Sequence, residues 1–284
     1  MIKLENVSKS YGNNIVLDNI DLCLEDNKIY GLIGRNGVGK TTLMKILSDQ
    51  IVNYQGQIFV DGANIKNDKT FKENLVIISD GFISEMQDPS KLKALTSTYR
   101  ILAPNFNQER YDELMHTFKL NEKTKYSKLS YGNQALYRSI IGLASGAKMI
   151  FLDEPANGLD EINRDIFYKK IIEYQEQDQS LIMVSSHILS DIERVVTDII
   201  FLKDSKVALN ESVESIEEKA YMITIDEDHL KFLENKNILS YKKVGKQLVV
   251  MVYDDFTSEE LDRLNARVDR MNLQELFKAF NKEA

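Results

Sequence analysis

A glycine-rich stretch near the amino terminus carries the residues best suited to chemistry. GRNGVGKT, residues 34–41, matches G-x-x-x-x-G-K-[ST] in full, with an apolar run before it and a segment of helical periodicity after it. Unpaired N–H groups and the positive end of the helix dipole make such a loop bind anionic phosphate. A chance glycine-rich turn is the alternative, and the strand–loop–helix context argues against it. The loop therefore predicts a nucleoside triphosphate site.

Each position of this loop has an expected task. We expect the side chain of Lys40 to reach the β- and γ-phosphates and the hydroxyl of Thr41 to ligate Mg²⁺. Backbone amides of residues 37–40 are expected to surround the β-phosphate. The expected ATP-binding positions in the loop are Asn36, Gly37, Val38, Gly39, Lys40, Thr41 and Thr42.

Two adjacent carboxylates form a second candidate site. MIFLDEP reads as a buried strand that ends in Asp153 and Glu154, and catalytic groups in open α/β sheets lie at the carboxyl ends of strands. We expect Asp153 to hold Mg²⁺ and Glu154 to accept the proton of the attacking water or to orient it. A strand that simply runs into a polar Asp-Glu-Pro turn is the alternative.

The composition limits the classes of protein. A chain of 284 residues with 43% hydrophobic and 28% charged residues is long enough for one large and one small globular domain. Its 44 acidic and 36 basic residues give a net charge of -8, so no global basic field indicates nucleic acid. Cys23 is the one cysteine, which excludes an internal disulfide and suits a reducing compartment. No apolar run approaches 18 residues, so we expect no membrane-spanning segment and no signal peptide.

The order of predicted elements indicates a parallel α/β sheet. Strands are expected at 2–12, 15–26 and 28–34, a hairpin at 56–65, and further strands at 74–79, 147–155 and 180–187. Helical patterns alternate with the later strands, and the segment of about 82–145 is predicted to be a helical subdomain. We place a domain boundary near residue 215.

The last 70 residues have a different pattern. They predict a small α+β unit, residues 216–284, with a strand at 221–228 and a hairpin at 238–255 that turns near Gly245. Two helices are expected, at 258–269 and 273–283. The charged first helix is most simply a solvent-facing one. No residue of this unit demands chemistry.

One stretch distinguishes among the many proteins with a phosphate-binding loop. LSYG, within KLSYGNQ at 128–134, closely resembles the LSGGQ signature of ABC-type ATPases, and its Ser130 stands 23 residues before Asp153. Tyr11 matches the aromatic residue that stacks on adenine in that family. PANGLD resembles the family's D-loop with Asp160 at its acidic position, and His187 in VSSH matches the switch histidine. His116 and His229 lack such a context. The ordered set covers residues 1 to about 210 and identifies the chain as resembling this family.

The resemblance implies a fold and an assembly. It implies an α/β P-loop NTPase with a mixed sheet core, an antiparallel β subdomain and a helical subdomain, over residues 1–215. It also implies a head-to-tail pairing with a second ATPase subunit, as a homo- or heterodimer, in which each ATP lies between Lys40 of one chain and Ser130 of the other. His187 would then stabilise the γ-phosphate and the attacking water. The signature positions expected to act on the partner's nucleotide are Ser130, Tyr131, Gly132 and Asn133.

The chain departs from the family's pattern at several positions. Asp80, in NLVIISDGF, stands where the family usually has glutamine. An aspartate is shorter and charged, and it could ligate Mg²⁺ but cannot donate a hydrogen bond. We expect Asp80, rather than Ser79, to be the further metal ligand. Tyr131 replaces a glycine of the signature, and Asn133 precedes Gln134 where the usual motif ends in glutamine. Because the serine and the second glycine are kept, we expect ATP binding between two chains to survive.

The leading hypothesis is the ATP-hydrolysing subunit of a transporter whose membrane-spanning subunits are separate polypeptides. The segment around Asp80 and the helical subdomain would be the docking surface, at the cytoplasmic face of the membrane. The pattern NFNQERYDELMHTFKL, followed by KLSYGNQ and a short C-terminal unit, is similar to ATPases of bacterial exporters of antibiotics and antimicrobial peptides, of the bacitracin, lantibiotic and phenol-soluble-modulin types.

Two other classes remain as alternatives. One is a soluble, non-transport ABC ATPase that acts on ribosomes, DNA or iron–sulfur assembly, which the acidic balance and the absence of a second cassette disfavour. The other is a P-loop switch or kinase, which would leave LSYG and His187 as accidents.

Overall fold

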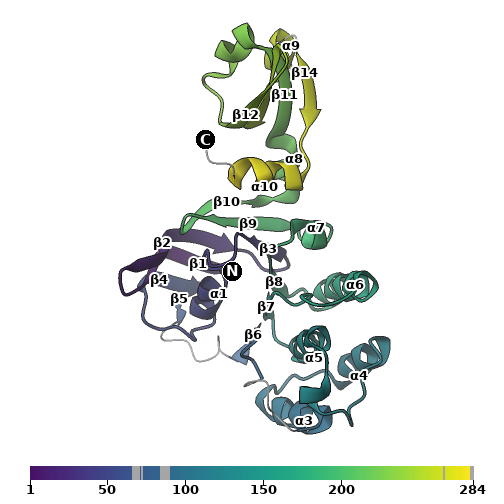
Figure 1. The fold of residues 1–284 in the computed structure, drawn as a ribbon. Helices are drawn as coiled ribbons and strands as arrows, with labels where there is room; N and C mark the ends of the chain where they lie inside the picture. Colours follow the sequence, from purple (N-terminus) through teal and green to yellow (C-terminus); the bar gives the residue numbers. More distant parts are fainter. Residues whose placement is uncertain (66–70, 72, 84–89, 265, 282–284) are drawn as a thin grey trace. The chain divides into compact units, whose positions relative to one another are not determined.

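The computed structural model describes residues 1–65, 71, 73–83, 90–264 and 266–281. The chain forms two compact units, Met1–Asn210 and Glu211–Ala284 (Figure 1). Each unit has its own core of buried apolar side chains. Residue 215, where the sequence analysis places the boundary, lies within helix α8 (Val213–Lys219). None of the helices in the described part of the chain is long and apolar enough to cross a bilayer.

An antiparallel sheet begins the first unit. It contains β1 (Ile2–Tyr11), β2 (Asn14–Leu24), β4 (Gln55–Val60) and β5 (Ala63–Asn64), in the order β2-β1-β4-β5. Gly12 and Asn13 connect β1 to β2, and Gly12 has a φ of 59° that glycine adopts at little cost. The alternation of buried and exposed residues along β1 and β2 turns one face of the sheet toward the core.

A second, six-stranded sheet positions the candidate site. Its order is β10-β9-β3-β8-β7-β6, with β3 (Ile29–Ile33), β6 (Leu75–Ile78), β7 (Met149–Asp153), β8 (Leu181–Ser186), β9 (Asp198–Lys203) and β10 (Lys206–Ser212). The pairs β3–β8, β3–β9, β7–β8 and β6–β7 are parallel. Because parallel strands end at the same edge, the loops after β3, β6, β7 and β8 meet there.

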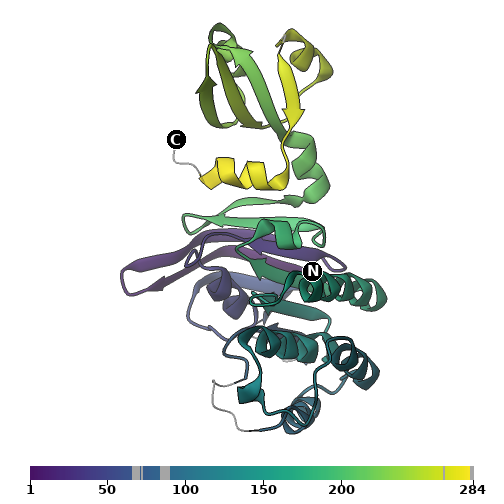
Figure 2. The ribbon, with the colours of Figure 1, turned by 45° about the vertical axis from the view of Figure 1, so that its right-hand side comes forward.

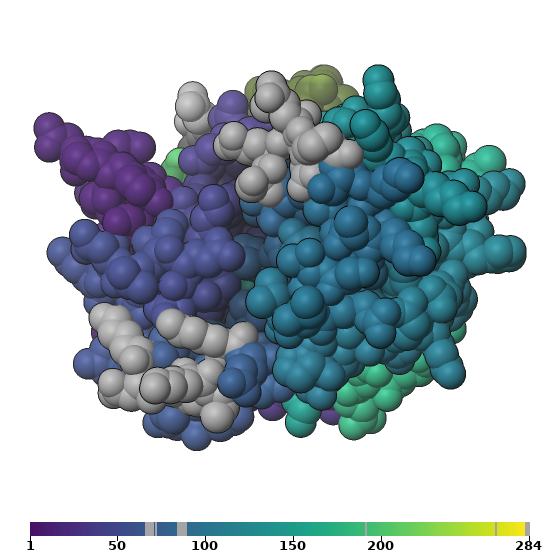
Figure 3. Space-filling view, turned by 90° about the horizontal axis from the view of Figure 1, so that it is seen from below, coloured from purple at the N-terminus to yellow at the C-terminus, as the bar shows by residue number. Residues whose placement is uncertain are grey.

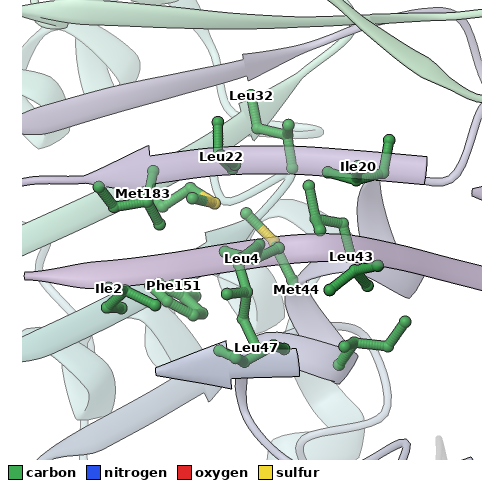
Figure 4. Close-up of a cluster of buried hydrophobic side chains, with 14 of the residues drawn as sticks. Ile2, Leu4, Ile20, Leu22, Leu32, Leu43, Met44, Leu47, Phe151 and Met183 are labelled. Carbon is green, nitrogen blue, oxygen red and sulfur yellow. The ribbon is translucent and has the colours of Figure 1, made fainter. Parts of the chain in front are cut away.

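Helices cover the six-stranded sheet on both of its faces. α1 (Lys40–Leu47) and the antiparallel sheet lie on one side, and α5 (Tyr131–Ala144) and α6 (Glu161–Asp178) lie on the other (Figures 1 and 2). On the side of the six-stranded sheet that carries α1, buried apolar side chains interdigitate, with Met44 of α1 between the two sheets (Figure 4). These side chains come from β1, β2, β3, α1, β7 and β8. This close packing holds the start of α1 against the ends of the strands.

The helical subdomain contains α3 (Leu92–Leu102), α4 (Gln108–Thr117), a 3₁₀ turn η2 (Tyr126–Lys128) and α5. α3 and α4 form a large part of the face seen in Figure 3. The side chain of Asn107 caps α4 by accepting a hydrogen bond from the N–H of Arg110 at 3.0 Å. Residues 84–89, which the sequence analysis includes in this subdomain, lie outside the described residues.

The second unit is a four-stranded antiparallel sheet with short helices. Its order is β12-β13-β11-β14, with β11 (Ala220–Asp226), β12 (Ile238–Val244), β13 (Gln247–Tyr253) and β14 (Arg267–Arg270). The helical segments are α8, η3 (Glu227–Leu233), α9 (Ser258–Arg263) and α10 (Leu273–Asn281). Gly245 lies in the turn between β12 and β13, with a φ of 64°.

The expected fold class is confirmed, with differences in detail. The helix predicted over 258–269 ends at Arg263, because residues 267–270 instead pair with β11 as a strand. The helical pattern predicted over residues 188–196, after β8, forms only a single turn, α7 (Leu189–Ile192). Strands β9 and β10 were not predicted. β9 is an apolar stretch whose type depends on its pairing with β3.

Candidate active site

The phosphate-binding loop connects β3 to α1. Gly37 and Gly39 have φ values of 82° and 114°, which favour glycine. A Cβ at Gly39 would also lie 2.9 Å from the carbonyl oxygen of Val16. The N–H of Leu43 donates to the carbonyl of Gly39 at 2.8 Å, so the first-turn amides of residues 40–42 have no helical acceptor. The N–H of Val38 donates to the backbone carbonyl oxygen of Arg35 at 3.2 Å.

Lys40 lies at the centre of the charges around this loop. Lys40 is 7% exposed, and its Nζ donates a hydrogen bond to the carbonyl oxygen of Gly34 at 2.8 Å. Oε1 of Glu154 is 3.8 Å from the same nitrogen. Burial lowers the pKa of Lys40, and the nearby carboxylates of Glu154 and Asp153 oppose that shift. A buried ammonium next to an anion-binding loop is suited to receive further negative charge.

Thr41 and Asp153 meet as the sequence analysis expects of a metal pair. The Thr41 hydroxyl donates to Oδ2 of Asp153 at 2.6 Å, and the Ser185 hydroxyl donates to Oδ1 at 2.5 Å. Within the described ranges, no group of three or more His, Cys, Asp and Glu residues that could hold a metal is present. Mg²⁺ on a nucleotide needs only one or two carboxylates besides phosphate and water oxygens. The oxygen donors of Thr41 and Asp153 fit that kind of site.

Glu154 connects the loop to His187. Its backbone has a φ of 51°, an uncommon conformation for a residue other than glycine, and its N–H donates to Oγ of Ser185 at 3.0 Å. Oε2 of Glu154 is 2.8 Å from Nδ1 of His187. The carboxylate thus lies between Lys40 and the imidazole.

Ser185 is a site residue that the sequence analysis missed. It lies in β8 beside Asp153 of β7, and its hydroxyl contacts both Asp153 and the backbone of Glu154. The signal available in the sequence was a pair of serines at the end of an apolar strand. The register between β7 and β8, which the sequence does not reveal, selects Ser185 over Ser186.

An open cavity of about 470 Å³ joins these groups. Nine of its lining residues are predicted site residues, among them Asp80 of the loop after β6, whereas the predicted Val38 does not line the cavity. Tyr11 and residues 130–133 are outside the lining in the described part of the chain, and His187 borders a neighbouring cavity of about 40 Å³. The cavity is lined by Val16, Asn36, Gly37, Gly39, Lys40, Thr41, Thr42, Lys45, Ser79, Asp80, Gly81, Asp153 and Glu154.

The signature residues begin helix α5. The Ser130 hydroxyl accepts a hydrogen bond from the N–H of Asn133 at 3.2 Å, which makes Ser130 the N-cap. A Cβ at Gly132 would lie 2.1 Å from the carbonyl oxygen of Gly158. The second glycine of the signature therefore allows α5 to approach the loop before α6. The structure presents Tyr131 half exposed at the first turn of α5.

The two remaining predicted residues occupy exposed positions. Asp160 is the N-cap of α6 and accepts from the N–H of Asn163 at 2.9 Å. The backbone and side-chain amides of Asn163 lower the pKa of Asp160. Tyr11 is half exposed at the end of β1, and the ammonium of Lys9 is 4.8 Å from its ring centroid. One face of the Tyr11 ring is thus covered by a cation.

Comparison with known proteins identifies the family. The family model for ABC transporters matches residues 17–157. The ABC transporter ATP-binding protein YtrB of Bacillus subtilis is 31% identical over 98% of this chain and 97% of its own length. The chain belongs to the ABC transporter ATP-binding proteins. The resemblance inferred from the sequence is confirmed, and the chain is an ATP-binding subunit and an ATPase of this family.

Other relatives agree with the type of transporter suggested by the sequence. The lantibiotic transport ATP-binding protein SrtF of Streptococcus pyogenes is 29% identical over 76% of this chain and 93% of its own. The bacitracin transport ATP-binding protein BcrA of Enterococcus faecalis is 31% identical over 69% of this chain and 64% of its own length. A solved structure of a putative cobalt transport ATP-binding protein covers 98% of this chain and 100% of its own, with a TM-score of 0.68 at 22% identity. That structure confirms the ABC ATPase fold.

Proposed function

We propose that Glu154 is the general base for ATP hydrolysis and that His187 orients it. The observation that carries this proposal is the single line of contacts from Lys40 through Glu154 to His187. Lys40 neutralises charge on the β- and γ-phosphates. The carboxylate of Glu154 accepts the proton of the attacking water, and His187 holds that carboxylate and stabilises the γ-phosphate. The uncommon backbone of Glu154, supported by Ser185, fixes the direction of its side chain.

Thr41 and Asp153 would hold Mg²⁺ in this site. The metal would supply positive charge for the phosphate oxygens. The hydroxyl and the carboxylate of this pair are already 2.6 Å apart, so little rearrangement is needed. The metal role that the sequence predicts for Asp80 is not part of this proposal.

We infer that the complete site needs a second chain. Ser130 is the N-cap of α5 on an exposed turn, and residues 130–133 lie outside the cavity lining among the described residues. A serine and the amides at a helix start can bind phosphate. In a head-to-tail pair, each ATP would lie between Lys40 of one chain and Ser130 of the other. We propose that the pair forms from two copies of this chain, and hydrolysis separates them.

A substitution separates base chemistry from binding. Glu154→Gln keeps the shape of the side chain but cannot accept the proton, so we expect hydrolysis to fall by roughly 100-fold or more. The affinity for Mg-ATP should stay within about twofold, since the loop is unchanged. Lys40→Ala should instead weaken nucleotide binding itself, and fluorescent-nucleotide titration beside phosphate release measures both. An unchanged rate of hydrolysis in Glu154→Gln would show that Glu154 is not the general base.

An apolar pocket beside Asp80 is our proposed docking surface for membrane subunits. It has a volume of about 180 Å³ and lies among β6, α3 and α5. Leu102 of α3, which lines the pocket, and the adjacent Ile101 are 73% and 83% exposed, which is unusual for large apolar side chains unless a partner covers them. The apolar pocket is lined in part by Leu75, Val76, Phe82, Tyr99, Leu102 and Pro104. A subunit bound there would place this chain at the cytoplasmic face of the membrane.

We further propose that the transporter exports peptides, antibiotics or similar amphipathic compounds. Similarity to SrtF and BcrA supports this substrate class. Affinity purification of this chain from detergent-solubilised host membranes, followed by mass spectrometry, tests the proposal. We expect a membrane protein with several spans to copurify. Recovery of ribosomal or other soluble partners alone would instead favour the non-transport alternative.

A further inference from the structure

Both carboxylate oxygens of Asp80 accept hydrogen bonds from side chains of α5. Arg138 donates to Oδ1 at 2.5 Å, and the hydroxyl of Tyr131 donates to Oδ2 at 3.0 Å. Asp80 also borders the nucleotide cavity together with Ser79 and Gly81. A side chain at the edge of the cavity is thus tied to the helix that begins with the signature residues.

Arg138 needs such a carboxylate. Its side chain is 6% exposed, whereas that of Asp80 is 70% exposed. A buried guanidinium is costly unless a negative charge and hydrogen-bond acceptors compensate it. Among the described residues, Asp80 is the carboxylate that pairs with Arg138. A glutamine at position 80 would accept a hydrogen bond but would leave the buried charge uncompensated.

The same contacts reach both sides of Ser130. Arg138 donates a second hydrogen bond to the hydroxyl of Tyr126, at 2.7 Å, and Tyr126 lies in η2 just before the signature. Tyr131 follows Ser130 directly. Two hydrogen-bonded routes therefore lead from Asp80 to the turn that presents Ser130, one through Arg138 and Tyr126 and one through Tyr131.

We propose that Asp80 is a positioning residue for the signature turn and not a metal ligand. It is the counter-ion of Arg138 and the acceptor for Tyr131, and through them it fixes the orientation of Ser130. Two of the departures of this chain from the family's pattern, Asp80 and Tyr131, are then parts of one contact. This inference rests on the proposed pairing of two chains, because Ser130 acts there on the nucleotide of the other copy.

The first test separates the two roles of Asp80. Asp80→Asn keeps the size of the side chain and removes its charge. Free Mn²⁺ measured by electron paramagnetic resonance gives the affinity of the ATP-loaded chain for that metal. We expect Asp80→Asn to change this affinity less than twofold, and Asp153→Asn to weaken it about tenfold or more. A loss in Asp80→Asn as large as in Asp153→Asn would overturn the proposal.

The second test measures the contact itself. Chemical unfolding of Asp80→Asn, Arg138→Gln and the double variant forms a double-mutant cycle. We expect the unfolding equilibrium constant of the double variant to rise about tenfold less than the product of the rises measured for the two single variants. Independent, multiplicative shifts would contradict the ion pair. This cycle needs neither ATP nor a second chain, so it remains informative if the proposed pairing of chains fails.

The third test measures positioning. In the Glu154→Gln background, we expect Tyr131→Phe and Asp80→Asn each to weaken ATP-driven pairing about tenfold, with Mn²⁺ affinity unchanged. Asp178→Asn is the matched control, because Asp178 pairs with the buried side chain of Arg110, and it should lower stability without changing the pairing. Tyr131→Phe removes one hydroxyl from a half-exposed side chain, so it keeps the fold. Unchanged pairing in both Tyr131→Phe and Asp80→Asn would overturn the positioning role.

Discussion

The hydroxyl of Ser185 contacts two adjacent residues of the candidate site, the carboxylate of Asp153 and the backbone of Glu154. It donates to Asp153 and accepts from the backbone of Glu154. We expect Ser185→Ala to lower kcat about tenfold or more, because it leaves the partly buried N–H of Glu154 unpaired and releases the side chain of Asp153. The affinity for ATP should change less than twofold. Steady-state phosphate release and nucleotide titration measure these values.

Ser186→Ala is the matched control for this prediction. The Ser186 hydroxyl contacts the backbone of Ile188 and neither of the two carboxylates. We expect this variant to keep kcat within about twofold of that of the unmodified chain. Equal losses of kcat in the two variants would show that Ser185 has no special role.

Residue types and spacing predicted much of the site. The pattern around Lys40 and the acidic end of β7 were enough to expect a phosphate site facing Asp153 and Glu154, because their context is local. Ser185 and the partners of Asp80 were not predicted. The contact between Ser185 and Asp153 joins residues that are 32 positions apart in the sequence, and the contact between Tyr131 and Asp80 joins residues that are 51 positions apart. No local pattern encodes such contacts.

At the scale of elements, an ion pair connects α4 to α6. Lys170 of α6 pairs with Glu113 of α4, and the hydroxyl of Tyr174 donates to Glu113 at 3.0 Å. The hydrogen bond from Lys170 is the main cause that lowers the pKa of Glu113. A carboxyl group with a lower pKa in the folded chain stabilises it above the unfolded pKa, and this stability is lost as the pH falls through the folded pKa.

The corresponding prediction concerns Glu113→Gln. At pH 7 we expect the free energy of unfolding to fall by about 0.5 kcal/mol, a small value because the Glu113 side chain is 45% exposed. As the pH falls through the folded pKa of Glu113, the difference between the variant and the unmodified chain should shrink, since protonation removes the charge that pairs with Lys170. Urea unfolding at pH 7 and at a series of lower pH values measures this. A difference that grows on acidification would contradict the ion pair.

Element types were predictable where periodicity is strong and long. α6 and the strands that pair in the six-stranded sheet follow from their apolar patterns. The segment 258–269 contains too few apolar residues to decide between helix and strand. The pairing of β14 with β11, far away in the sequence, decides it.

At the scale of the whole molecule, each unit has a separate core. Ile223 is fully buried in the second unit, so we expect Ile223→Ala to lower the stability of that unit by about 3 kcal/mol. Val244→Ala, at an exposed position of the same unit, should change stability by less than about 0.5 kcal/mol. ATP affinity should be unaffected in both variants, as the cavity residues all belong to the first unit. Calorimetry and nucleotide titration test this, and a joint loss of ATP binding would contradict separate cores.

Light scattering of the Glu154→Gln variant with and without Mg-ATP tests the central claim most directly. If two chains enclose ATP between Lys40 of one copy and Ser130 of the other, the mass should rise from that of one 32.7 kDa chain to twice that value when Mg-ATP is added. Lys40→Ala in the same background should keep the mass of one chain. A mass of one chain for Glu154→Gln at saturating Mg-ATP, with binding verified in the same sample, would contradict the account.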